Sequence, residues 1–337
     1  YNNTVDRIIV TEWQTLANWD IQSLTRQGVP GVWTWGFFDG WWPGYGAWVA
    51  TNHNSISRFY ETFGNAGADT YLRDLRGQTY AGDSVTTAQW YRPWPPTAKV
   101  LWSLRNNTNF MQGGVLSSLE YAARHGRDLL ANFWQKGANS IERGRTRTPH
   151  GFVIPAFSDQ RDPRRAAYLV NQLVRHGIEI HRSTDTLPGS YVVKLDQPYR
   201  DLAVNLLTKQ DYPSSARYPP YDDIAWTLGL LYGAEVKPVD DPAVLTWRGL
   251  ELLRDTVAWR GSASRPTAAG ASNGATDTWL LKYTAQAELL PALYALKQRE
   301  SRATAQVAET TFTVAGTEWA AGTVILEGLS AAGAEWL

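Results

Sequence analysis

Glu61 is the residue of this sequence best placed for acid–base chemistry. It lies within Ser55–Phe63 (SISRFYETF), a segment whose β-branched and aromatic content predicts a strand. Arg58 lies on the same segment, and the polar run Asn52–Asn54 comes just before it. A carboxylate that is partly buried near a cation and amides can serve as a general base. The alternative interpretation is an exposed glutamate on an edge strand.

Tyr45 is the second candidate, as a residue that contacts substrate. It stands between two glycines in WWPGYG, within an aromatic loop that covers residues 33–48. Glycine on both sides favours a loop that can cover a ligand. The alternative is that the Tyr45 ring only packs against its neighbours.

The H-x-x-E motif at His176 and Glu179 has the form that supplies two zinc ligands in several hydrolases. Gly177 is typical of a helix end, so we expect His176 to end a helix and Glu179 to belong to the next strand. No histidine follows His181 to provide a distant third ligand. We therefore interpret this motif as structural.

We also interpret His125 and the Asp222–Asp223 pair as structural rather than catalytic. His125 lies on a polar face of a predicted helix, where we expect it to be solvated. The pair Asp222–Asp223 comes at a predicted helix start, where aspartate acts as an N-cap.

Composition excludes several classes of protein. The chain of 337 residues has no cysteine, which excludes disulfides, thiolate metal sites and a cysteine nucleophile. Lys+Arg and Asp+Glu number 32 each, so the basic surface typical of nucleic-acid binding is not indicated. No apolar run reaches the length of a membrane span. The 17 Trp, 16 Tyr and 9 Phe favour thick packing layers or a surface that stacks on ligands.

The first part of the chain, residues 1–146, is aromatic-rich and irregular. Its predicted elements are helices over 11–27 and 109–137, the strand 55–63, a long polar connection over 71–96 and a basic linker over 142–150.

The rest of the chain is predicted to be α/β, in two related units or two layers, over residues 147–240 and 241–337. In the first unit we expect strands over 151–156, 178–182 and 190–195. We expect a helix that Asp162–Pro163 opens and residues 166–175 continue to a stop at Gly177, and further helices over 198–207 and 224–231. In the second we expect strands over 266–271, 303–307 and 321–326 and a helix over 276–297.

Several blocks, in order, resemble large bacterial zinc carboxypeptidase-like proteins, which are relatives of carboxypeptidase A with appended α/β domains. The resemblance covers about residues 29–234 and, more loosely, 262–327. The blocks are FFDGWWPGYGAWVATNHNSISRFYETFGN, NSIERG, GFVIP with QRDPRRAAYLVNQLVRHGIEIHR, GSYVVKLDQPYRDLAVNLL and PPYDDIAWTLGLLYG.

The resemblance implies a secreted or periplasmic hydrolase of carboxyl-terminal peptide bonds. In that family one zinc is held by the His and Glu of an H-x-x-E motif and by a second, distant His, and a later Glu is the general base. Glu61 matches the position of that Glu. A tyrosine on a mobile loop is also typical, and Tyr45 is the candidate, although its spacing from Glu61 is shorter than expected.

The sequence departs from the family in one large respect. The zinc ligands belong well before the Glu segment, yet only 60 residues precede Glu61 and His53 is their single histidine. The chain thus resembles the carboxyl-terminal part of a peptidase domain with a mixed sheet, followed by amidotransferase-like α/β units. We expect zinc and a peptide substrate for the full-length protein, no zinc ligands in this chain, and a sequence that begins and ends inside a longer one. Its own amino-terminal part, as a separate polypeptide, is a candidate partner.

The appended units resemble class I glutamine amidotransferase-like domains in their order of strands and helices. Those enzymes use a cysteine nucleophile, which this chain lacks, so the units are expected to be a scaffold or binding surface. The alternative for the whole chain is a non-catalytic binding or assembly protein that keeps a degenerate peptidase fold.

Overall fold

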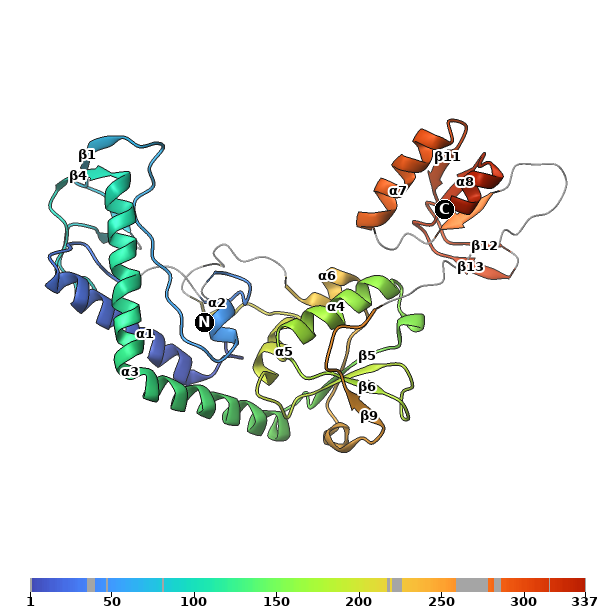
Figure 1. Ribbon diagram of the computed structural model, residues 1–337, viewed down its shortest axis with the longest axis horizontal. Helices are drawn as coiled ribbons and strands as arrows, with labels where there is room; N and C mark the ends of the chain where they lie inside the picture. Colours follow the sequence, from blue (N-terminus) through green and yellow to red (C-terminus); the bar gives the residue numbers. More distant parts are fainter. Residues whose placement is uncertain are drawn as a thin grey trace.

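The computed structural model describes residues 2–34, 40–46, 48–80, 82–216, 219, 226–258, 278–281, 286–314 and 316–336 (Figure 1). The helices are α1 (Arg7–Arg26), α2 (Trp48–Asn52), α3 (Leu104–Thr146), α4 (Pro163–Arg175), α5 (Arg200–Leu207), α6 (Leu228–Tyr232), α7 (Gln286–Arg299) and α8 (Ala331–Trp336), with short 3₁₀ turns η1 (Phe157–Asp159) and η2 (Pro242–Thr246). The strands are β1 (Thr70–Asp74), β2 (Thr79–Tyr80), β3 (Asp83–Ser84), β4 (Lys99–Ser103), β5 (Gly151–Ile154), β6 (His181–Ser183), β7 (Tyr191–Lys194), β8 (Lys237–Val239), β9 (Leu250–Leu252), β10 (Trp279–Leu281), β11 (Thr304–Val307), β12 (Phe312–Val314), β13 (Thr317–Trp319) and β14 (Val324–Glu327).

Helix α1 confirms the first predicted helix and begins four residues before the predicted start. Asp6 is its N-cap, with a carboxylate oxygen that accepts a hydrogen bond from the Ile8 backbone N–H at 2.9 Å. The helix ends where Gly28 takes a left-handed conformation, with φ of 83°.

Helix α3 runs 43 residues, well beyond the predicted 109–137, so the predicted linker over 142–150 begins as helix and is wrong up to Thr146. Asn106 supports its start, because the Asn106 side-chain oxygen accepts hydrogen bonds from both the backbone N–H and the hydroxyl of Ser103. At His125 the backbone leaves helical geometry (φ −112°, ψ 15°), and α3 bends there into two arms (Figure 1).

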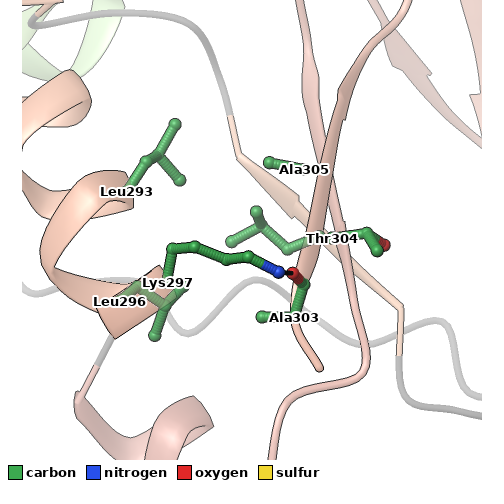
Figure 2. A pocket seen from close by; sticks show the side chains of 7 residues that line it. Leu293, Leu296, Lys297, Ala303, Thr304 and Ala305 are labelled. Carbon is green, nitrogen blue, oxygen red and sulfur yellow. Dashed lines mark hydrogen bonds between the residues drawn. The ribbon is translucent and has the colours of Figure 1, made fainter. Parts of the chain in front are cut away.

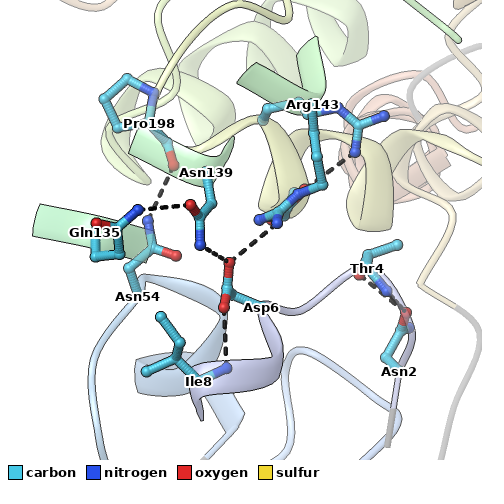
Figure 3. Close-up of polar contacts among 11 residues, drawn as sticks. Asn2, Thr4, Asp6, Ile8, Asn54, Gln135, Asn139, Arg143 and Pro198 are labelled. Carbon is cyan, nitrogen blue, oxygen red and sulfur yellow. Dashed lines mark hydrogen bonds and ion pairs between the residues drawn. The ribbon is translucent and has the colours of Figure 1, made fainter. Parts of the chain in front are cut away.

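Helices α1 and α3 pack antiparallel, and charged side chains line their interface. Lys136 Nζ lies 2.5 Å from Glu12 Oε2 with both side chains buried, and Asn132 donates to the other Glu12 oxygen at 2.9 Å. Near the start of α1, Asp6 accepts hydrogen bonds from Asn139 and Arg143, each at 3.0 Å (Figure 3). Each buried charge on α1 thus meets a partner on α3.

The central unit is a five-stranded sheet in the order β8-β5-β7-β6-β9, and every pair in it is antiparallel. Helices α4 and α5 confirm two predicted helices, while β6 starts three residues later than predicted. Strand β9 belongs to this sheet, so the predicted boundary between residues 240 and 241 is wrong because it cuts through the sheet.

Strands β5 and β7 form the centre of this sheet and are buried on both faces. Phe152 and Ile154 pack with Leu169 of α4 and Leu202 of α5, whereas Val153 turns to the opposite face and packs near η2. Period-two alternation therefore divides one apolar strand between two cores.

A buried amide network joins the first part of the chain to the central unit. Asn205 of α5 donates to the side-chain oxygen of Asn52 at 2.9 Å and accepts from Asn2 at 2.9 Å. Arg143 of α3 bonds to Asp201 of α5 as well as to Asp6. These contacts set the position of α2 against α5.

Within the described residues of 2–146 the strands form two small antiparallel sheets, β1–β4 and β2–β3. The expected mixed sheet is therefore wrong for this part of the chain. The polar connection predicted over 71–96 contains most of β1 and all of β2 and β3. Leu75 of this stretch is fully buried.

The carboxyl-terminal unit contains the three-stranded antiparallel sheet β10-β14-β11 and the hairpin β12–β13. The predicted helix over 276–297 is wrong at its start, where β10 lies, and right over α7. The predicted strand over 266–271 lies outside the described residues. In the part of the chain that the structure describes, no helix has the length and apolarity to cross a membrane.

The buried Glu12–Lys136 pair yields a test of the α1–α3 interface. Lys136→Met leaves the Glu12 carboxylate buried without its cation, so we expect the free energy of unfolding to fall by about 3–5 kcal/mol. The double variant Glu12→Leu/Lys136→Met removes both charges and should recover most of that loss. Urea unfolding followed by tryptophan fluorescence measures both. A loss in the double variant equal to or larger than that in Lys136→Met contradicts this account.

Candidate functional site

The segment that carries Glu61 belongs to no sheet among the described residues, so the predicted strand over 55–63 is wrong. Burial nevertheless alternates over residues 58–62, as in a strand, whereas residues 55–58 are all half-buried. Phe59 and Glu61 are exposed, whereas Arg58 and Tyr60 are half-buried and turn inward. The segment therefore has one face on the protein and one open face, and Glu61 lies on the open face.

The inward face is held by a polar network that the sequence did not reveal. The Tyr60 hydroxyl donates to Asp20 Oδ2 at 2.9 Å and contacts the Ser118 hydroxyl, which lies 3.1 Å from the same oxygen. Arg58 Nε lies 3.7 Å from Asp20, and its guanidinium covers the Trp13 ring at 4.5 Å. Helices α1 and α3 thus fix the segment from behind.

Burial changes the acidity of this network. It raises the pKa of Asp20 above its ordinary value, although the hydrogen bonds and Arg58 oppose that rise. Burial likewise raises the pKa of Tyr60 and lowers that of Arg58. The sequence pattern suggested a partly buried Glu61, but the structure buries the Asp20 carboxylate beside Arg58 and leaves Glu61 exposed, as the alternative interpretation has it.

Tyr45 packs beside the Glu61 segment. Its ring centroid lies 6.1 Å from that of Phe59 and 6.2 Å from that of Trp42. Because Phe59 and Glu61 are two residues apart on the open face, the structure places Tyr45 on the same side of the segment as Glu61. Part of the aromatic loop, residues 35–39 and 47, lies outside the described residues.

The run Asn52–Asn54 does not surround Glu61. Asn52 bonds to Asn205, and Asn54 donates to the Pro198 backbone carbonyl at 3.0 Å (Figure 3). His53 contacts His176. The side chains of Asn52, His53 and Asn54 therefore attach the end of α2 to the central unit.

The two histidines meet across this interface. His176 Nδ1 lies 3.3 Å from His53 Nε2, and His53 Nδ1 lies 2.6 Å from the Val49 backbone carbonyl. A carbonyl accepts a hydrogen bond, so His53 Nδ1 carries the proton and Nε2 can accept one from His176. The Tyr199 ring borders the pair at 5.5 Å from His53. Burial, and then His53, lower the pKa of His176.

The H-x-x-E motif has the local structure that we expected at its start. His176 is the C-cap of α4, and Gly177 has a φ of 77°. Glu179 is exposed and precedes β6 rather than lying in it. Among the described residues, no group of three or more His, Asp or Glu side chains is placed to hold a metal ion.

Two remaining expectations have different outcomes. His125 is half-buried rather than fully solvated, with its ring 4.5 Å from that of Tyr121 and 5.8 Å from that of Trp19. The pair Asp222–Asp223 lies outside the described residues.

A hollow of about 320 Å³ lies in the carboxyl-terminal unit between α7 and β11 (Figure 2). Its lining is Leu293, Leu296, Lys297, Ala303, Thr304, Ala305 and Leu326. Lys297 Nζ donates to the backbone carbonyls of Ser301 and Ala303, at 2.9 and 2.7 Å. The only charged side chain in this lining is therefore engaged in closing the turn after α7, and we assign the hollow no chemistry.

Comparison of the chain with models of protein families, with characterised proteins and with solved structures gave no match. The resemblance to zinc carboxypeptidases therefore stays a prediction from the sequence blocks.

The histidine pair leads to a test by pH. The folded-state pKa of His176 lies below its ordinary value of 6.5. The contribution of neutral His176 to the free energy of unfolding is therefore fully present above pH 6.5 and is lost as the pH falls through the folded pKa. We expect His176→Asn, which cannot be protonated, to lose less unfolding free energy than the parent between about pH 7.5 and pH 5. Thermal or urea unfolding at both pH values measures the difference, and equal losses in the two proteins contradict it.

Proposed function

We propose that this chain supplies the general base and one wall of the substrate cleft of a zinc carboxypeptidase-like hydrolase. Glu61 is the base, Tyr45 contacts the substrate, and the zinc ligands belong to a further polypeptide segment. The observation that carries the proposal is the stretch of residues 58–62, in which half-buried and exposed residues alternate and Glu61 lies on the open face.

Unpaired buried polar atoms support the idea that another segment packs here. Ten buried side-chain nitrogen or oxygen atoms of the described residues lack a hydrogen-bond partner within the chain. Five of them belong to Arg58, Thr62, Asn65 and Arg73, and of these only Arg58 Nε has an ion-pair contact, with Asp20 at 3.7 Å. Native structures pair the great majority of such atoms. Their concentration along and beside the Glu61 segment is expected where a second polypeptide completes the structure.

The chemistry of Glu61 follows from its position as an exposed carboxylate beside aromatic rings. It accepts a proton from the water that attacks the terminal peptide carbonyl, and it returns that proton to the amine nitrogen as the C–N bond breaks. The products are a free carboxylate and an amine. Tyr45 and Phe59 offer ring surface to the terminal side chain of the peptide.

Zinc does not fit the described residues of this chain. His53 and His176 are the two histidines in contact, and no third ligand joins them. The resemblance places zinc in the full-length protein, so we derive no step through a metal here. The secreted or periplasmic location likewise rests on the resemblance alone.

The test requires the chain assembled with the segment that carries zinc, as native material. Zinc content by mass spectrometry and hydrolysis of an N-acylated dipeptide establish the activity. Glu61→Gln keeps the size of the side chain and removes the base, so we expect kcat to fall by about 10²–10⁴-fold with KM little changed.

Glu179→Gln is the matched control, because Glu179 is also exposed and lies on the central unit. It should leave kcat unchanged. Full activity in Glu61→Gln overturns the assignment of the base. Native material without zinc and without hydrolysis overturns the enzymatic proposal as a whole.

The second candidate is a non-catalytic binding protein, and the exposed tryptophans favour it. Trp90 is fully exposed and Trp94 is 44% exposed, in the loop between β3 and β4. Exposed indole rings stack on ligands such as glycans. Loss of binding in Trp90→Ala to an immobilised glycan, with hydrolysis absent in the parent, is the result expected for this function.

A further inference from the structure

Apart from Leu104 at its first position, helix α3 carries six exposed large apolar side chains, on faces that α1 does not cover. They are Val115, Leu116, Leu119, Leu130, Phe133 and Trp134, and each is between 42% and 71% exposed. At about 100° per residue, the three on each arm of α3 fall within roughly 100° of arc. Soluble proteins rarely leave such a stripe uncovered.

The order of these residues is symmetric about the bend. Leu119, Leu116 and Val115 lie five, eight and nine residues before Arg124. Leu130, Phe133 and Trp134 lie five, eight and nine residues after His125. The centre of the pattern therefore falls between Arg124 and His125, at the point where α3 bends (Figure 1).

The centre of the stripe also has small residues in symmetric places. Ala123 lies one residue before Arg124, and Gly126 lies one residue after His125. A Cβ added at Gly126 would meet no atom within 4 Å, so the surface beside it is open. Small residues at a helix crossing allow two backbones to approach closely.

We propose that α3 is the interface of a two-fold symmetric dimer of this chain, in which α3 of one copy lies antiparallel on α3 of the other. A two-fold axis through the bend places residue i of one copy opposite its symmetric counterpart in the other, as an isologous interface requires. Leu119 then faces Leu130, Leu116 faces Phe133 and Val115 faces Trp134, so that an aliphatic side chain meets an aromatic one in two of the three pairs.

Charge on the edge of the stripe fits the same arrangement. Under the two-fold axis, Glu120 of one copy lies within two residues of Arg127 of the other, an acid beside a base. Together Glu120, Arg124, Arg127 and Asp128 balance to zero, whereas a helix that binds a membrane surface is typically bordered by lysine and arginine.

The area is adequate for a specific contact. The exposed parts of the six side chains amount to on the order of 700 Å² per copy, close to the ~800 Å² per partner of a standard interface. Two aromatic residues per copy, Phe133 and Trp134, provide the anchors that such interfaces use.

The first test is the mass of the full chain in solution by light scattering, at concentrations from about 1 to 100 μM. The parent is expected to be a dimer over this range. Leu119→Asp puts an acid against Leu130 twice in each dimer and should weaken association at least 100-fold. Leu230→Asp on α6 is the control, since Leu230 is similarly exposed but lies outside the stripe. Far-ultraviolet circular dichroism shows that each variant is folded.

The second test fixes the register. The chain has no cysteine, so introduced thiols are the only ones present. Residues 119 and 130 of one copy lie roughly 15 Å apart along α3, too far for a disulfide, which needs Cα atoms within about 7 Å. The double variant Leu119→Cys/Leu130→Cys should therefore form a covalent dimer on mild oxidation, and either single variant should not.

Two results would overturn the dimer. One is a parent that stays monomeric at the highest concentration, including a monomer whose stripe is instead covered by another polypeptide. The other is equal cross-linking in the single and double cysteine variants. Neither result depends on Glu61, so failure of the dimer and failure of the proposed hydrolase are separate outcomes.

Discussion

The antiparallel contact between α1 and α3 holds its register through charge. Burying Glu12 without Lys136 would leave an isolated ion in a medium of low dielectric constant, which costs several kcal/mol. A shift of one helix along the other would separate this pair and the Asp6–Arg143 pair together. Apolar packing alone tolerates such shifts more easily, because it is not directional. The charged pairs therefore select one alignment of the two helices.

That alignment determines where the candidate site lies. Asp20 of α1 and Ser118 of α3 come together only in this register, and together they bind Tyr60. Tyr60 in turn decides which side of its segment points inward, because neighbouring residues of an extended chain alternate between faces. Glu61 is consequently directed outward, with Phe59 and the Tyr45 ring on the same side.

The end of α3 connects this arrangement to the central unit. The Arg143 guanidinium binds Asp6 of α1 and Asp201 of α5 at the same time. The amide network around Asn205 adds direct bonds to Asn2 and Asn52. These hydrogen bonds are buried, so the two parts of the chain dock in a defined way. Helix α3 thus holds the candidate site in place through Ser118, and it carries an apolar stripe on the faces that α1 does not cover.

Local signals in the sequence determined the regular elements. Asp6 and Gly28 bound α1, Asp162 and Gly177 bound α4, and the apolar runs of β5 and β7 mark the central strands. Each of these depends on residues close in sequence, namely caps, turns and periodicity. The end of α1, the helix α4 and the two central strands are predicted, whereas the start of α1 lies four residues before the predicted one. Residue type and resemblance point to Glu61 and Tyr45 as site residues. Neither predicts on which face of the structure these two side chains lie.

Tertiary structure alone decided which polar residues are buried and what they meet. Asp20 and Glu12 look like ordinary surface residues of a helix, and Lys136 like a solvated cation, until α3 folds back on α1 more than a hundred residues later. Segment 55–63 has the composition of a strand yet pairs with no strand among the described residues, because hydrogen bonds between strands require a partner that composition cannot supply. The sequence by itself thus determined the elements that caps and periodicity mark, such as α4, β5 and β7. Long-range pairing of charges and hydrogen bonds decided which faces close and which remain open.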